Sequence, residues 1–237
     1  MALLDTMRPV VDATIERLAQ KTFCCDPLMG EENSRITSVV SSAYKRHGSI
    51  LEAAILECLR TFDKFEVWND PALSISNAAD ALAATYMTNP EAALSANIAH
   101  GGPATRTLQV DLLVYDHERN TVASYEVKRG AGSHDAGKRR SMLRDLIATQ
   151  VVLKSYAEER LGCGCNQATS HIIVYYGAES FGPFTLTRDQ LDDHFGVPII
   201  EQVEEVNAYY RGRVEQLLAM PPPDVDEMLP ELGIGPD

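Results

Sequence analysis

Residues 106–130, RTLQVDLLVYDHERNTVASYEVKRG, decide the fold that we expect for this chain. Two runs rich in strand-forming residues, 107–115 and 121–128, flank a polar tip at residues 117–120. This pattern predicts a β-hairpin, although the tip lacks the Asn-Gly pair of the tightest turns. The two strands of a hairpin run antiparallel, so the start of the first strand lies near the end of the second.

Three charged residues occupy those neighbouring ends. Asp111 lies near the start of the first predicted strand, and Glu126 and Lys128 lie near the end of the second. Side chains alternate across a strand, so Glu126 and Lys128 share one face while Val127 points to the other. Two carboxylates and an ammonium are therefore expected to converge at one open end of a sheet.

Two carboxylates beside an ammonium suit the metal-assisted hydrolysis of a phosphodiester. Two carboxylates suit a hard cation, Mg²⁺ or Mn²⁺, which polarises a phosphoryl oxygen and lowers the pKa of a bound water. A lysine beside the cation can orient that water and offset charge on the phosphate. The alternative is an ordinary Glu–Lys pair on a surface strand, because Glu-x-Lys is a very common pattern.

At Asp111 and Glu126-Val127-Lys128, together with a glutamate on an upstream helix, the chain resembles the PD-(D/E)xK nuclease superfamily. The resemblance covers residues 49–156, and it departs from the motif at Val110, where the motif has proline. The resemblance implies an α/β fold: a restriction endonuclease-like central mixed sheet flanked by helices, with the hairpin at its middle. Extra helices would precede that core.

Glu52 is the candidate for the helix glutamate. It shares a row with Ile55 and Leu59 on the apolar side of a helix predicted over residues 49–62. An alternative role is local, because Ser49 and Glu52 have the spacing of a capping box. Glu57 is the rival, but it lies on another face, near Arg60, and is typical of an ion pair in solvent.

Further candidates lie behind the Glu-x-Lys strand. Gln150 is on the following helix, where some exonuclease branches of the superfamily resembled carry a glutamine that faces the metal; the alternative is a glutamine satisfied by its neighbours. The residues expected to hold nucleic-acid phosphates are Arg129, Lys138, Arg139 and Arg140. A basic helix face in solvent is the competing interpretation.

The charge distribution is uneven. The whole chain has a net charge of −13, which argues against a strong non-specific grip on phosphates. Residues 128–160 hold eight bases and four acids, a local net charge of +4, so the rest carries −17. A basic element behind the candidate strand, on an acidic body, is typical of a narrow substrate groove.

Other functional classes find little support. P-loop, dinucleotide-binding and serine-hydrolase motifs are absent, and the six histidines lack zinc-hydrolase spacing. Cys163 and Cys165 with His171 lack the second paired cluster of a zinc site. The five cysteines show no disulfide framework, which favours a reducing compartment.

Helical spacing predicts helices over 5–21, 31–45, 49–62, 137–161 and 199–220, with a strand at 65–68 and an alanine-rich helix at 78–86. His47-Gly48 is expected to end the second helix, and Thr187 and Gln190 have the spacing of a capping box. We therefore expect a helical N-terminal extension over residues 1–48, packed on a nuclease core over residues 49–220. An acidic, proline-containing tail would follow over residues 221–237.

The sequence thus leads to a cytoplasmic, Mg²⁺- or Mn²⁺-dependent DNA endonuclease, with a restriction enzyme as the leading form. Its expected metal ligands are Asp111, Glu126 and Glu52; Lys128 and Gln150 complete the catalytic set. The alternative is a catalytically silent nuclease-like module that binds DNA or a protein partner. A third hypothesis is a nuclease that acts on RNA or on single strands. No membrane partner is expected, and the sequence allows a homodimer.

Overall fold

The computed structural model describes residues 2–21, 24–69, 71–130, 132 and 134–220. The predicted acidic tail, residues 221–237, lies outside the described residues. Within the described ranges, no helix combines the length and apolar character needed to cross a membrane.

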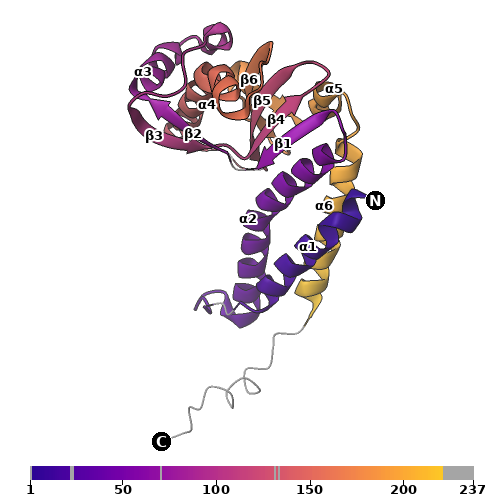
Figure 1. Cartoon of the computed structure of the whole chain (residues 1–237). Coiled ribbons are helices and arrows are strands. Elements are labelled where there is room, and N and C mark those ends of the chain that lie inside the picture. The colour runs from indigo at the N-terminus through magenta and orange to yellow at the C-terminus, as the bar shows by residue number, and fades with distance from the viewer. Residues whose placement is uncertain (1, 22–23, 70, 131, 133, 221–237) are drawn as a thin grey trace, which may run out of the picture.

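A five-stranded mixed sheet forms the centre of the molecule, in the order β1-β4-β5-β6-β7. Its strands are β1 (Phe65–Asn69), β4 (Leu112–Asp116), β5 (Thr121–Lys128), β6 (Gln167–Val174) and β7 (Thr185–Thr187). β4 pairs antiparallel with both β1 and β5, whereas β5–β6 and β6–β7 are parallel. The fold is therefore α/β, with a mixed sheet flanked by helices and the predicted hairpin, β4–β5, inside it (Figure 1).

The tip of the hairpin is stabilised by side chains rather than by an Asn-Gly pair. The Asp116 carboxylate accepts hydrogen bonds from the amides of Glu118 and Arg119, both at 2.9 Å. Asn120 takes a φ of +51°, a left-handed conformation that asparagine tolerates better than most residues. An aspartate and an asparagine thus close the turn that joins the two strands.

The first predicted strand of the hairpin is interrupted. The sequence pattern predicted one strand over residues 107–115, but β3 (Ala104–Gln109) ends before Asp111 and β4 begins after it. β3 pairs antiparallel with β2 (Ala72–Ser76) in a separate two-stranded sheet. The prediction of a single strand was therefore wrong, because β3 and β4 belong to different sheets. Val110 and Asp111 form the step between these two strands.

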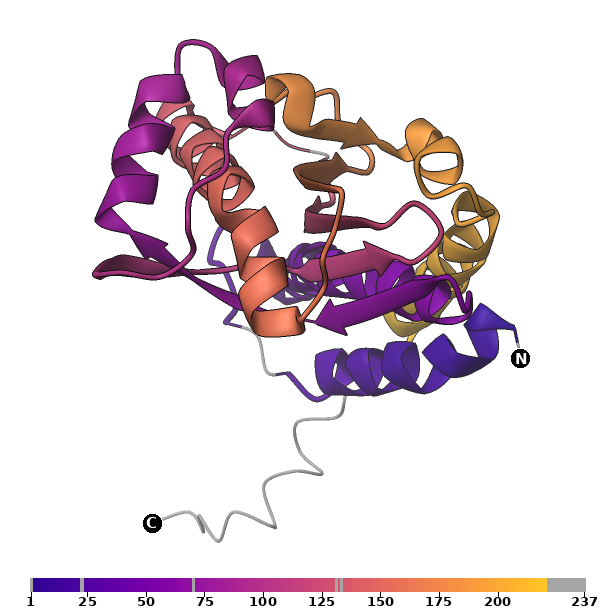
Figure 2. The ribbon, with the colours of Figure 1, turned by 45° about the horizontal axis from the view of Figure 1, so that its top comes forward.

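Three helices pack together against one face of the large sheet. They are α1 (Leu3–Ala19), α2 (Gly30–Arg60) and α6 (Ile200–Ala219), and they lie side by side in Figures 1 and 2. Their buried apolar side chains join those of Ala123, Tyr125 and Val127 in one core. Residues from both ends of the chain thus cover this face.

α2 is one helix where two were predicted. It runs through His47 and Gly48, the expected stop. A glycine inside a helix costs only about 1 kcal/mol relative to alanine. His47 is buried, and its Nε2 lies 2.9 Å from Asn207 Oδ1 on α6, which holds α2 in place there. The predicted end of a helix at His47-Gly48 is therefore wrong, because α2 continues to Arg60.

The opposite face of the sheet is covered by α4 (Ala136–Tyr156), and α3 (Asn77–Tyr86) packs on α4 and on the small β2–β3 sheet. A 3-10 turn (Pro90–Ser95) follows α3, and a π-helical turn (Ala157–Leu161) ends the long helix predicted over residues 137–161. Gly182–Phe184 and Arg188–Gln190 are short 3-10 turns, and α5 spans Leu191–Phe195. The predicted capping box of Thr187 and Gln190 is present. Val122 and Ile172 from the sheet pack with this second layer.

Candidate active site

The carboxylate of Asp111 lies where the β4–β5 ladder ends. Leu112 and Tyr125 form the last paired residues at that end of β4. One step further, Asp111 Oδ2 accepts a hydrogen bond from the backbone amide of Val127 at 2.6 Å. The side chain thus takes over a role that a strand carbonyl would have in a longer ladder, and it is held between Glu126 and Lys128.

Lys128 connects the two carboxylates. Its Nζ donates a hydrogen bond to Glu126 Oε1 and lies 3.7 Å from Asp111 Oδ2. The side chains are partly exposed: 20% for Asp111, 30% for Glu126 and 32% for Lys128, so the cluster is reachable from solvent. The convergence of these three groups, expected from strand alternation and antiparallel pairing, is present in the structure.

Burial and charge act against each other in this cluster. Burial is the main reason that the pKa of Glu126 is raised, and the nearby charge of Asp111 adds to it while Lys128 opposes it. For Lys128, burial favours the neutral amine, but the charges of Glu126 and Asp111 outweigh it and raise the pKa. The lysine therefore stays protonated, as a group that interacts with phosphate must.

Glu52, on α2, acts on this cluster through its charge. It is half-buried, and its charge is among those that raise the pKa of Lys128. The capping role is excluded, because Ser49 lies in the middle of α2 and no helix begins there. Glu57, the rival, pairs with Arg60 at 2.7 Å, as its spacing predicted. Glu52 is thus the upstream acid whose electrostatic influence reaches Lys128.

The donor set suits a hard divalent cation only in part. Within the described ranges, no group of three or more His, Cys, Asp or Glu side chains is arranged to hold a metal ion. Mg²⁺, however, is commonly bound by one or two carboxylates, several waters and substrate phosphate oxygens, without a complete protein cage. Asp111 and Glu126 provide such a pair, whereas Glu52 is linked to the cluster only through the effect of its charge on Lys128.

Gln150 serves the sheet instead of the cluster. Its side chain is buried; Nε2 donates to the carbonyl of Ala168 at 3.0 Å, and Oε1 accepts from the amide of Ser170 at 2.8 Å. β7 pairs with β6 only from Ile172 onward, so the Gln150 amide satisfies backbone groups that no strand covers. Gln150 is therefore a glutamine whose polar atoms are satisfied by its neighbours, which was the alternative to a catalytic role. These contacts give the catalytic assignment no support.

The candidate phosphate-binding residues fall into two groups. Lys138, Arg139 and Arg140 are exposed in the first turns of α4, where Arg139 Nε lies 3.1 Å from Glu179 Oε1. Arg129 is different: its guanidinium lies 3.7 Å from the Tyr44 ring centre, and its Nε donates to His47 Nδ1 at 2.9 Å. Arg129 thus links the end of β5 to α2, while the other three side chains are exposed to solvent and Arg139 is paired with Glu179.

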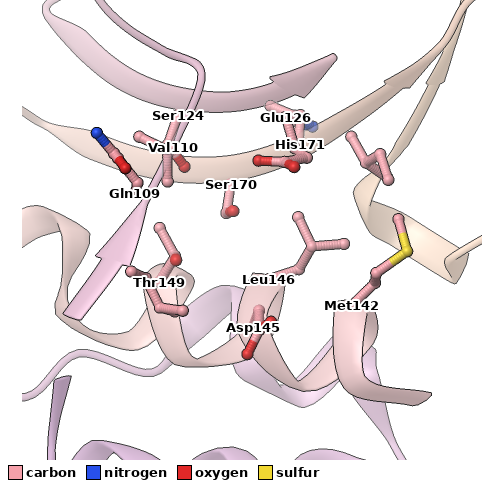
Figure 3. Close-up of a pocket in the computed structure, with 12 residues that line it drawn as sticks. Gln109, Val110, Ser124, Glu126, Met142, Asp145, Leu146, Thr149, Ser170 and His171 are labelled. Atoms are coloured by element: carbon pink, nitrogen blue, oxygen red, sulfur yellow. The ribbon is translucent and has the colours of Figure 1, made fainter. Parts of the chain in front are cut away.

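A cavity of about 100 Å³ adjoins Glu126, and sequence reasoning missed it. It lies between α4 and the sheet (Figure 3). Its polar lining includes Ser124 on β5, Thr149 on α4 and Ser170 on β6, all at most 2% exposed. Strand alternation places Ser124 on the face of Glu126, but only the packing of α4 shows that the two border a hollow.

No protein-family model, curated protein or solved structure matches the chain.

Proposed function

We propose that this protein is a metal-dependent nuclease that hydrolyses phosphodiester bonds, with DNA as its substrate. The observation that carries the proposal is the convergence of Asp111, Glu126 and Lys128 at the end of the β4–β5 ladder. Two oxygen ligands for a hard cation and a charged ammonium within one site match the needs of phosphoryl chemistry.

Each residue of the site has a separate task. Asp111 and Glu126 would hold Mg²⁺ or Mn²⁺, which when bound supplies a Lewis acid and lowers the pKa of a water. Lys128 donates hydrogen bonds toward the phosphate and stabilises negative charge that develops in the transition state. Its contacts with both carboxylates fix its position before substrate arrives. Glu52 adds negative charge from the α2 side.

The architecture supports the more specific restriction endonuclease-like assignment. The resemblance implied a mixed sheet with the hairpin at its middle and helices on both faces, and the chain has such a sheet. The exposed bases Lys138, Arg139 and Arg140 begin α4, the helix that follows β5 and the reacting groups. Phosphate contacts there would position a strand without reading its sequence.

One observation favours the silent binding module. Lys128 contacts both carboxylates and offsets one of their two negative charges, and no third acidic, histidine or cysteine ligand completes a metal site among the residues that the structure describes. A cation would therefore compete with Lys128 for these oxygens and would need further ligands from water or a phosphate. The two proposals differ in one measurable property: a nuclease cleaves the nucleic acid that it binds, whereas the silent module does not.

The test is cleavage of supercoiled plasmid and of linear duplex in Mg²⁺, Mn²⁺ or EDTA, with Glu126→Gln and Glu57→Gln as a matched pair. Glutamine at 126 keeps an oxygen for Lys128 but removes a charged ligand, whereas Glu57 lies on α2 in a surface pair with Arg60. We expect metal-dependent cleavage by the wild type and Glu57→Gln, and little by Glu126→Gln. DNA binding without cleavage in either metal would instead identify the silent module.

A further inference from the structure

We propose that the cavity beside Glu126 receives one unpaired pyrimidine nucleoside of the substrate, next to the phosphate that is cleaved. This inference rests on the proposed nuclease function and names its substrate class: a strand with at least one unpaired nucleotide at the site. The cavity and the cluster share Glu126, so a nucleotide with its ring in the cavity has its phosphate near Lys128.

The hydroxyl of Ser124 is a buried polar group that a ligand in the cavity could bind. The residue is 1% exposed, lines the cavity, and its Oγ is buried without a hydrogen-bond partner in the described part of the chain. A buried polar atom without a partner costs about 1–3 kcal/mol, so such atoms are rare unless they serve a function. A ligand that enters the cavity would supply the partner.

The charge of the lining excludes phosphate from the cavity. Its acids are Glu126 and Asp145, and none of the described residues that line it is a lysine or an arginine. Each acid has its own cation outside the lining: Lys128 pairs with Glu126, and Arg106 with Asp145. The other polar residues of the lining are Gln109, His171 and the three hydroxyl residues, and burial keeps the His171 ring neutral by lowering its pKa. Neutral groups and paired carboxylates suit a ligand with neutral N–H and O–H groups, such as those of a base or sugar.

The apolar lining favours a ring. The apolar part of the wall comes from β3, the step after it, α4 and β6: Leu108, Val110, Met142, Leu146 and Ile172. Figure 3 shows the α4 side chains Thr149 and Leu146 across the hollow from Ser124, Ser170 and Glu126 on the sheet. Most ligand sites combine such apolar walls with a few polar groups that fix orientation.

The volume favours a pyrimidine over a purine. About 100 Å³ far exceeds the ~10–15 Å³ that one water needs, but it is below the ~150 Å³ of a closed cavity known to bind benzene. The cavity is partly open to solvent, so a six-membered ring can enter with one edge exposed. A fused purine ring would extend beyond it. A base inside a duplex cannot reach such a pocket without leaving the stack, and unpaired strands avoid that cost.

The first experiment measures nucleoside binding in EDTA, where no cleavage occurs. Cytidine, deoxycytidine, thymidine, uridine, adenosine and guanosine are titrated by ligand-observed NMR, with inorganic phosphate as a further probe. We expect the pyrimidine nucleosides to bind more tightly than the purine nucleosides. The ribose and deoxyribose forms of cytosine distinguish an RNA-type from a DNA-type substrate.

Two variants and one control connect binding to the cavity. Ser124→Ala removes the unpaired hydroxyl, so we expect about tenfold weaker nucleoside binding, the value of one hydrogen bond, with unchanged or higher thermal stability. Thr149→Val should weaken binding in the same way. Thr14→Val changes another buried helical threonine, on α1, and should leave binding unchanged.

The experiments give different results when the pocket inference is wrong and when the nuclease proposal is wrong. If the wild type cleaves DNA but binds no nucleoside, or if Ser124→Ala and Thr149→Val bind as the wild type does, the pocket inference is overturned and the nuclease proposal stands. If nucleosides bind as expected and the protein cleaves no nucleic acid, the cavity is a nucleoside site and the nuclease proposal fails. A cleaving wild type should prefer single strands or frayed ends to intact duplex; equal rates on both overturn the unpaired-substrate inference.

Discussion

Replacement of Asp111 separates its structural role from its chemical one. The carboxylate accepts the hydrogen bond of the Val127 amide at 2.6 Å, and Val127 is only 4% exposed. Asp111→Ala leaves that buried amide without its acceptor, which costs about 1–3 kcal/mol. For a chain of this size, about 2–4 °C of melting temperature is lost per kcal/mol, so the alanine variant should melt several degrees lower.

Asp111→Asn keeps the acceptor oxygen and removes the charge. The lost attraction is that to Lys128 Nζ at 3.7 Å, between side chains that are 20% and 32% exposed. Partly exposed ion pairs contribute at most about 1 kcal/mol, so the asparagine variant should be clearly more stable than the alanine variant. Both variants should lose metal-dependent cleavage, because the negative ligand is gone in each.

The assay is urea unfolding followed by circular dichroism, with the slope of the transition compared between variants to show that the unfolded state is unchanged. Equal destabilisation by alanine and asparagine would refute the proposed role of the Val127 hydrogen bond. Cleavage at the wild-type rate in Asp111→Asn would refute its role as a metal ligand.

Three further changes follow from the structure. Glu52→Gln should leave the fold intact and lower the apparent metal affinity of cleavage, because a negative charge that acts on Lys128 is lost; a metal titration identical to that of the wild type would remove Glu52 from the site. Burial lowers the pKa of His171 to about 3, so the folded state excludes a proton that the unfolded state takes up below about pH 6.5, and stability is lost as pH falls through that window. Between pH 7 and pH 5 this amounts to up to about 2 kcal/mol, and His171→Phe should show a correspondingly smaller loss in urea unfolding; an equal loss would place the titration elsewhere. Gly48→Ala should raise the free energy of unfolding by about 0.5–1 kcal/mol, because α2 is continuous at that point and a Cβ there meets no atom within 4 Å. A lower free energy of unfolding in this variant would indicate a break in the helix.

The parts of the fold that the sequence predicts are local. Alternation along residues 121–128 and the polar tip predict the hairpin, since both depend on neighbours in the chain. The convergence of Glu126 and Lys128 with Asp111 follows from strand phase and antiparallel pairing alone. The capping box of Thr187 and Gln190 is present for the same reason.

The parts that sequence reasoning missed depend on distant residues. α2 continues through Gly48 because His47 is held by Asn207, 160 residues later. Gln150 bonds the β6 backbone because β7 is too short to cover it, which no pattern near Gln150 reveals. The cavity exists only because α4 packs across Ser124 and leaves a gap.

The most direct test of the central claim compares Lys128→Ala with Lys154→Ala in metal-dependent cleavage. Lys128 contacts both carboxylates of the site, whereas Lys154 lies near the end of α4 and bonds the carbonyl of Asn166 at 3.4 Å. Loss of a group that stabilises the transition state should slow cleavage on the order of 10²–10³-fold in Lys128→Ala, with DNA binding in Ca²⁺ largely kept. Lys154→Ala should cleave as the wild type does. Full cleavage by Lys128→Ala, or no metal-dependent cleavage of any nucleic acid by the wild type, would contradict the proposed function.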